Sequence, residues 1–308
     1  MRKPVDILLR LTSHVPCDPA EAGERHRTEI DGLRAMVLLP SLAQKGDGRL
    51  GAPIGVSLQD DDDHRERWGL ANSGAECYPT IDIDAVVLRF HRTVDSPAEL
   101  AERLGSKLRP WQSRVLEWLR TLARHPLLPR SFGARFVRET ALIAGGSCQP
   151  WEPPTKFKPI HFGAPLFWSR VAPVGAWRRA IREATRGADP PLEHALMNRA
   201  RAALDEFDDR IAAIEAGSAC EVAITASIER RLARGDQKVA RALLGRTRML
   251  GSLIQLSREL GIALPSDIDE KLVKLRNDAV HRGGAPARGA ASKAVEIAEA
   301  VIAAHSRP

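Results

Sequence analysis

Cysteine, aromatic residues and long apolar runs are scarce in this sequence. Its 308 residues include four cysteines, which lie far apart and form no Cys-x-x-Cys pair. This spacing argues against a zinc ribbon, a redox motif and a dense disulfide scaffold. No apolar stretch approaches the roughly 18 residues of a membrane-spanning helix, and no small-residue cleavage site follows the first residues. We therefore expect a cytoplasmic protein with no membrane partner.

Several motifs of well-known enzyme classes are also missing. The sequence has no Gly-rich phosphate loop, no Gly-x-Ser-x-Gly elbow and no His-Glu-x-x-His helix. Four consecutive aspartates, residues 60–63, precede His64 and offer clustered oxygen ligands. Consecutive carboxylates lack the alternate spacing of a calcium loop, so we interpret this run as a solvated loop and expect no metal site.

What the sequence does contain is typical of a soluble protein with two domains. Apolar residues make up 44% and charged residues 28%, and 308 residues exceed the usual length of one domain. The formal net charge is +7, which allows attraction to a polyanion such as a phosphate backbone but does not by itself establish one.

The first ninety residues have the alternating pattern of β-strands. Apolar side chains occupy every second position from Val5 to Leu11, a period of two that predicts a half-buried strand. Residues 33–39, 54–58 and 81–94 are further predicted strands. A helix is predicted from Ser96 to Gly105, and a second from 110 to 124 carries a core stripe. We predict another strand at 134–143 and a short helix at 175–184.

A polar segment rich in glycine and proline, residues 187–191, predicts a domain boundary. Beyond it, helices are predicted at 192–204, 208–232, 238–260, 266–282 and 291–304, the lengths expected for an antiparallel bundle. The fold class is therefore α+β. A β-rich domain with a few helices spans residues 1–188 and has a possible sensor or regulatory role, and an all-α bundle spans 189–308.

The bundle contains an Arg-Asn-x-x-x-His motif at Arg276, Asn277 and His281. Because arginine is abundant, one Arg-x-x-x-x-His spacing is expected by chance, and Arg120 with His125 supplies it. That first match has no asparagine after the arginine and lies on the helix with the core stripe, so we interpret it as structural.

This motif resembles that of the HEPN family. It lies late in an all-helical domain, on a segment where Leu272, Leu275 and Ala279 form a core-facing stripe. The alanine-rich segment 208–221, with Glu221 at its end, is similar to the family's second helix. The resemblance covers about residues 190–306 and implies a helical bundle, while the first domain resembles no family that we recognise.

The resemblance implies a metal-independent endoribonuclease, of the kind that serves as a toxin or an antiviral-defence effector, with no cofactor. His281 would take the proton from a ribose 2′-hydroxyl, and Arg276 would stabilise the charge on the attacked phosphate. Asn277 would orient His281 or the phosphate. On a helix Asn277 and His281 share one face, whereas Arg276 points about 140° away.

Two alternatives stay open at this point. The first is a non-catalytic dimerisation or adaptor module, in which Arg276 and His281 only cap a helix end and the β-rich domain recognises a ligand or a protein. The second concerns Glu221, whose apolar surroundings call for a partner. Arg276 is the candidate, either as part of the site or as a salt bridge between two helices.

The expected partners are RNA, a second copy of the chain and a possible protein trigger or inhibitor. A homodimer through the bundle would place two Arg276/His281 sets across a two-fold axis. The argument is a surplus of apolar side chains, namely Ile211, Ile214, Ile228, Leu232, Leu253, Ile254 and Leu256. The predicted RNA-binding side chains are all basic. Five lie between residues 230 and 241 and the sixth directly follows His281: Arg230, Arg231, Arg234, Lys238, Arg241 and Arg282.

Overall fold

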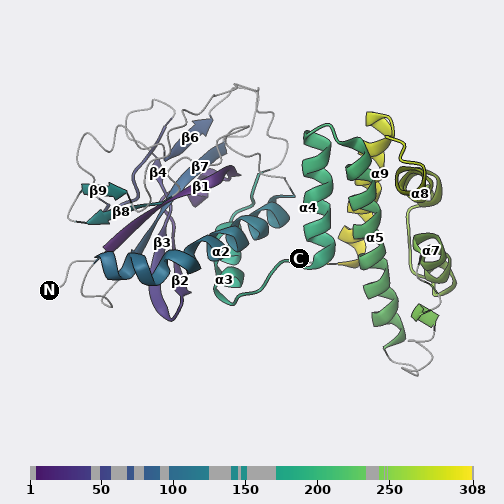
Figure 1. The fold of residues 1–308 in the computed structure, drawn as a ribbon, viewed down its shortest axis with the longest axis horizontal. Helices are drawn as coiled ribbons and strands as arrows, with labels where there is room; N and C mark the ends of the chain where they lie inside the picture. Colours follow the sequence, from purple (N-terminus) through teal and green to yellow (C-terminus); the bar gives the residue numbers. More distant parts are fainter. Residues whose placement is uncertain are drawn as a thin grey trace. The chain divides into compact units, whose positions relative to one another are not determined.

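A computed structural model describes residues 5–42, 49–56, 68–72, 80–90, 97–124, 140–144, 147–150, 171–233, 243–245, 247 and 249–306. The chain divides into two compact units, Met1–Asp189 and Pro190–Pro308, and this division falls one residue from the predicted boundary. The first unit contains an antiparallel sheet and the second is helical (Figure 1), which confirms the α+β class.

The first unit is built on a seven-stranded sheet whose strands all pair antiparallel. Its strands run in the order β2-β3-β7-β1-β8-β9, and β6 pairs with β7 beside β3. They are β1 (Val5–Cys17), β2 (Arg25–Ile30), β3 (Leu33–Leu38), β6 (Gly69–Asn72), β7 (Thr80–Phe90), β8 (Thr140–Ala144) and β9 (Ser147–Pro150). A separate two-stranded ladder joins β4 (Ser41–Leu42) and β5 (Leu50–Gly51), and a 3-10 turn, η1 (Pro19–Glu21), follows β1.

Strand β2 was not predicted, although the sequence contains its signal. The strand alternates exposed and buried residues and pairs with β3 through a two-residue loop, in which Asp31 and Gly32 both have positive φ, 53° and 75°. An Asp-Gly pair with positive φ at both positions suits the tight turn of a β-hairpin, because its twist matches that of the strands. The hairpin was therefore readable from this dipeptide.

The strand predicted at residues 54–58 is wrong for the residues that the structure describes there. Residues 53–56 form a turn, in which the Val56 N–H donates to the Pro53 carbonyl at 3.0 Å and Gly55 has φ of 81°. Gly55 occupies the third position of this turn, where glycine accepts the positive φ without a steric cost.

The two helices predicted at 96–105 and 110–124 form one helix, α2 (Pro97–Ala123), with Pro110 inside it. The predicted stop at Gly105 is wrong because the buried stripe continues across it through Leu104, Leu108 and Trp111. Burial of this stripe outweighs the cost of one glycine and one proline.

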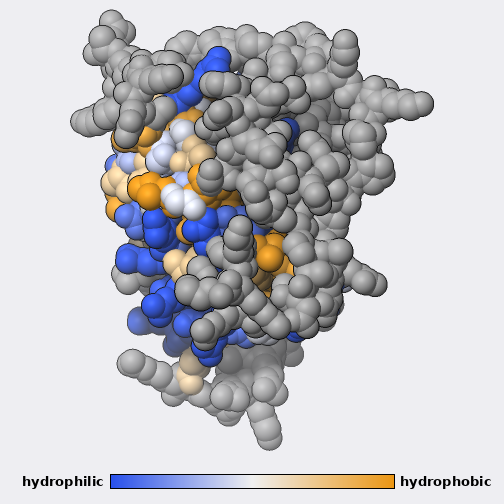
Figure 2. All heavy atoms as spheres, turned by 90° about the vertical axis from the view of Figure 1, so that its left-hand side faces the viewer, coloured by the Kyte–Doolittle hydropathy of each residue, from blue (hydrophilic) through white to orange (hydrophobic). Residues whose placement is uncertain are grey.

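The core of the first unit lies between the sheet and its two helices. Helix α3 (Ala176–Thr185) packs on α2 and β2, and the indole N–H of Trp118 in α2 donates to the Ala188 carbonyl at 2.8 Å. The core stripe predicted within residues 110–124 is confirmed, because Trp111, Trp118 and Leu119 of that segment are buried. On the coloured part of the face in Figure 2, hydrophilic and hydrophobic residues are intermixed.

The second unit is a bundle around one central helix, α5 (Asp209–Leu232). Helices α4 (Leu192–Asp205) and α9 (Arg288–His305) pack along it, and α7 (Leu250–Glu259) and α8 (Lys274–His281) contact it as well (Figure 1). A π-helical turn, η2 (Asp269–Val273), leads into α8. Among the described helices, α5 alone has the length and apolar composition of a membrane span, and half of that apolar window is buried in the bundle, as in a core helix.

The helix predicted at 238–260 is wrong in its extent. Helix α7 begins at Leu250, directly after Met249, whose backbone is extended (φ −103°, ψ 143°). Residues 234–242, 246 and 248 lie outside the described part of the chain, and residues 243–245 have helical backbone.

Candidate functional site

The motif lies where α8 crosses the first half of α5. Arg210 in α5 donates from Nε to the Ala279 carbonyl at 2.9 Å. That carbonyl belongs to the last turn of α8, where carbonyl groups have no partner within the helix. The end of α8 is thereby fixed against α5, and the motif residues take their positions from this crossing.

Arg276 faces α5 and not solvent. Leu272 and Ala279 are fully buried, and Arg276 follows the first by four residues and precedes the second by three, so it belongs to the same inward stripe. The predicted stripe named Leu275, which is only partly buried. Leu275 packs against the core of the bundle as predicted, and Arg276 occupies the inward position between Leu272 and Ala279.

The side chain of Arg276 crosses α5 at Gly217 and ends near Glu221. A Cβ atom built on Gly217 would lie 2.6 Å from Arg276 Cγ, and Arg276 Nη2 is 3.7 Å from Glu221 Oε2. Gly217 and Glu221 are one turn apart on the same face of α5, so the apolar stem lies on the glycine and the guanidinium reaches the carboxylate. The predicted pairing of Arg276 with Glu221 is therefore present.

The guanidinium of Arg276 keeps most of its hydrogen-bonding capacity. Of its five N–H groups, one donates to Asn277 Oδ1, with Nη1 and Oδ1 3.2 Å apart, and the contact with Glu221 is longer than a hydrogen bond. Nε is buried and has no hydrogen-bond partner within the described residues. The side chain is 21% exposed, so a guanidinium held against α5 retains donors for an anion.

Asn277 forms a side-chain hydrogen bond with its neighbour Arg276. We expected it to orient His281 or a phosphate, but its amide oxygen accepts the hydrogen bond from Arg276. Arg276 and Asn277 are adjacent in the chain, so the long side chain of the arginine bends back to reach the short side chain of the asparagine. Asn277 therefore contacts the guanidinium through its amide oxygen.

His281 is exposed at the end of α8 and is not joined to Arg276. Within the described part of the chain, no hydrogen bond or ion pair holds its ring. The next residue, Arg282, forms a surface ion pair with Asp278, at 3.3 Å between Nη1 and Oδ1. A solvent-accessible imidazole is able to meet a polymer, and no hydrogen bond joins it to Arg276 within one copy of the chain.

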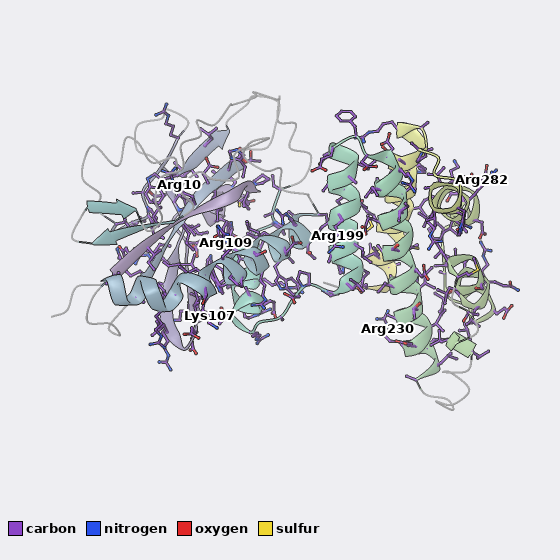
Figure 3. The ribbon with its side chains drawn as sticks, in the orientation of Figure 1. Arg10, Lys107, Arg109, Arg199, Arg230 and Arg282 are labelled. Atoms are coloured by element: carbon purple, nitrogen blue, oxygen red, sulfur yellow. The ribbon has the colours of Figure 1, made fainter. Side chains whose placement is uncertain are left out.

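Among the predicted RNA-binding residues that the structure describes, Arg230 and Arg282 lie on different elements. Figure 3 shows Arg282 beside α8 and Arg230 on the far half of α5. Arg230 follows Glu221 by nine residues, about half a turn around the helix, so the two side chains leave opposite faces. Arg231 is exposed near Arg230, whereas Arg234, Lys238 and Arg241 lie outside the described residues.

Arg230 instead borders a shallow hollow on the side of α5 that faces α9. The hollow encloses about 540 Å³ and is lined by Ser227, Arg230, Ala304 and His305. Arg230 donates to the His305 carbonyl, and His305 Nε2 donates to the Ala263 carbonyl at 2.8 Å. The first bond joins the ends of α5 and α9 and gives Arg230 a structural role in addition to any contact with RNA, and the second joins α9 to the segment after α7.

The apolar surplus invoked for a dimer is mostly absent. Ile228, Leu253, Ile254 and Leu256 are buried in the core of one copy, and Ile214 and Leu232 are partly buried. The core of the bundle uses them because α7 and α9 both pack on α5. Only Ile211 of the set is exposed, at 38%, and Phe207 and Val280 are further exposed apolar residues on neighbouring elements.

The remaining predicted features lie away from the motif. Arg120, of the chance match, forms an ion pair with Glu117 of its own helix, and His125 lies outside the described residues, as does the acidic run 60–64. Among the described residues, no group of three or more His, Cys, Asp or Glu side chains is placed to hold a metal ion.

Comparisons with protein-family models, with curated proteins and with solved structures give no match to this chain. The resemblance to the HEPN family therefore rests on the motif, its place in the bundle and the glutamate of the second helix. Two residues of the site escaped the sequence analysis, Gly217 and Arg210. The signal for Gly217 was a glycine one turn before Glu221 in an alanine-rich helix.

Proposed function

We propose that the bundle is a metal-independent endoribonuclease of the HEPN type, regulated by the β-rich unit. The observation that supports it is the partly buried guanidinium of Arg276, which is fixed by Gly217 and Asn277 and retains donors. A fixed arginine with unused donors is suited to stabilise negative charge that develops on a phosphate.

The chemistry assigns one task to each motif residue. Neutral His281 takes the proton of a ribose 2′-hydroxyl, whose oxygen then attacks the adjacent phosphorus. The new P–O2′ bond and the broken P–O5′ bond leave a 2′,3′-cyclic phosphate and a 5′-hydroxyl, which takes a proton from solvent. Arg276 stabilises the phosphorane, and Asn277 holds Arg276 in place, so the reaction uses no metal ion.

Within one copy the bonds of Arg276 go to Asn277 and Glu221 and none joins it to His281, which favours a composite site in a homodimer. A second copy would bring its own arginine–histidine set to the phosphate across a two-fold axis. The exposed Ile211 and Val280 belong to the two helices that carry Arg276 and its partners, and they offer apolar area for that contact. Dilution below the dimer dissociation constant should therefore abolish cleavage in step with the loss of dimer, as measured by light scattering and by cleavage rate.

The alternative is a non-catalytic dimerisation or adaptor module. It is favoured by one observation, that Arg276 lies on the core stripe and pairs with Glu221, which is also the arrangement of a salt bridge between two helices. Under this alternative Arg276 matters for packing only, and His281 has no role.

A cleavage assay on a mixed-sequence, end-labelled single-stranded RNA with EDTA present separates the two. We expect cutting that leaves 2′,3′-cyclic phosphate ends, and a loss of at least about 100-fold in both His281→Ala and Arg276→Ala, the scale for a general base or a charge stabiliser. The matched control is Arg258→Ala, an exposed arginine of α7 paired with Asp269. Cutting that ignored both motif substitutions would place the chemistry at other residues, and no cutting by the dimer would favour the adaptor module.

A further inference from the structure

The meeting point of Gly217 and Arg276 is unusually close. A Cβ atom on residue 217 would lie 2.6 Å from Arg276 Cγ, 3.1 Å from its Cβ and 3.6 Å from its Cδ. Real Cβ atoms do not approach other heavy atoms to 2.6 Å, so a side chain at residue 217 requires Arg276 to move. All three nearest atoms belong to this one arginine, so its stem is what a side chain at residue 217 would meet first.

A glycine inside a helix needs a reason, because it weakens the helix relative to alanine. Gly217 lies in the middle of α5, and its backbone is helical. Gly251 of α7 provides a comparison within the same bundle, since a Cβ there would meet Val273 Cγ1 at 3.9 Å, an ordinary contact. The glycine of α7 has room for a methyl group, whereas that of α5 does not.

The contacts around the stem show what the glycine achieves. Arg210 fixes the end of α8 to α5 through the Ala279 carbonyl, so α8 cannot easily move outward. With the helix fixed, the stem of Arg276 fits between α8 and α5 only where residue 217 has no side chain. Glu221, one turn further along α5, then receives the guanidinium at 3.7 Å.

We propose that Gly217 is a positioning residue for Arg276: its missing side chain seats the arginine stem on α5 and directs the guanidinium to Glu221 and Asn277. Where RNA cleavage is concerned, this inference rests on the proposed function. The seat itself does not. Gly217→Ala should therefore strengthen α5 locally and yet displace Arg276, a combination that a glycine needed for general helix packing would not give.

The first test measures the coupling between the two residues without any RNA. Thermal melting of the full chain, followed by helical circular dichroism, compares Gly217→Ala in the wild type and in Arg276→Ala. We expect a fall of a few degrees in the wild type and a smaller fall or a rise in Arg276→Ala, where only a contact of 3.1 Å to Cβ remains. Gly251→Ala is the matched control and should not lower the melting temperature in either background.

The second test reads the position of the guanidinium itself. Arginine-specific labelling with phenylglyoxal, followed by peptide mass spectrometry, should modify Arg276 several-fold faster in Gly217→Ala than in the wild type. Arg230, on the opposite face of α5, serves as the internal standard and should react at the same rate in both proteins.

The outcomes of the two tests separate the inference from the proposed function. Equal melting shifts in both backgrounds, or an unchanged labelling rate of Arg276, would contradict the inference that Gly217 positions Arg276. If both tests succeed and Gly217→Ala lowers kcat for RNA at least about tenfold with KM little changed, the seat positions a catalytic arginine. If both succeed and the chain cleaves no RNA, the seat stands and the nuclease does not.

Discussion

Each unit of the molecule joins two neighbouring elements through an arginine and a carboxylate, but the two pairs differ in how the arginine is used. In the sheet, Arg89 of β7 donates to both oxygens of Asp6 on β1, from Nε at 2.8 Å and from Nη2 at 2.6 Å. Nη2 also donates to the Gly55 carbonyl at 2.7 Å. In the bundle, Arg276 makes one hydrogen bond and a looser contact with Glu221.

The difference teaches how a structural arginine is told from a candidate functional one. Asp6 and Arg89 lie directly opposite each other on adjacent strands, and the hydrogen bond to Asp6 raises the pKa of Arg89. The guanidinium of Arg89 thus uses its donors in a bidentate pair with one carboxylate. Arg276 is buried to a similar extent but has N–H donors without a partner. A buried arginine with unused hydrogen-bond donors is therefore a better sign of a functional site than its charge alone.

The largest effect is expected from breaking the enclosed pair of the sheet. Asp6→Ala leaves Arg89 without its carboxylate and should lower the free energy of unfolding of the first unit by about 3 kcal/mol. All six tryptophans precede Pro190, so tryptophan fluorescence during urea unfolding reports this unit alone. The control is Asp189→Ala, whose pair with Arg114 is exposed and should contribute less than about 1 kcal/mol. Equal losses in the two variants would contradict the contrast.

A second buried carboxylate of the sheet unit should show itself through pH. Glu21 accepts the Gly175 N–H at 2.5 Å, and burial raises its pKa above the usual value. Ionisation in the folded state is therefore disfavoured, so the stabilising contribution of the neutral form is complete below the unfolded pKa and is lost as pH rises through the folded one.

Glu21→Gln keeps the acceptor but does not titrate. We expect this variant to be more stable than the wild type at pH 7, with the difference vanishing below about pH 4, near the ordinary glutamate pKa. His26, whose pKa is lowered by burial, titrates in both proteins and contributes with the opposite sign. Urea unfolding by tryptophan fluorescence at a series of pH values measures the difference, and a constant difference would contradict the assignment.

The loose pair of the bundle should contribute little to stability. Glu221→Ala removes the partner of Arg276, but both side chains are partly exposed, at 28% and 21%, and the contact is 3.7 Å. The free energy of unfolding followed by helical circular dichroism should fall by less than about 1 kcal/mol. A loss as large as that of Asp6→Ala would mean that the two pairs serve the same structural purpose.

The smallest effect concerns the basic residue beside the site. If Arg282 contacts one phosphate, Arg282→Ala should weaken RNA binding and reduce the slope of log K against log salt by about 0.7, the value for one contact to a single strand. Arg230→Ala tests whether the far side of α5 contributes as well. Fluorescence anisotropy with labelled RNA at several salt concentrations gives both slopes, and an unchanged slope would remove that residue from the RNA surface.

The sequence predicted elements best where a buried stripe agreed with its local signals. Helix α5 begins at Asp209, capped by Asp208, and ends at Leu232, close to the predicted 208–232. The prediction failed where packing overrode a local signal, as at Gly105 and Pro110 inside α2. Their local cost is small beside the burial of the leucine and tryptophan stripe, whose extent depends on the sheet that lies beneath it.

By itself the sequence determined the α+β class, the position of the boundary, the Arg-Asn-x-x-x-His motif and the candidate pairing of Arg276 with Glu221. Periodicity and spacing carry that information because they depend on one helix or strand at a time. Only the tertiary structure decided the direction in which Arg276 points. Helical spacing gives the angle between Arg276 and His281, but it does not say which side of the helix faces the core. That direction follows from the contact between α8 and α5, where a glycine leaves room for an arginine stem.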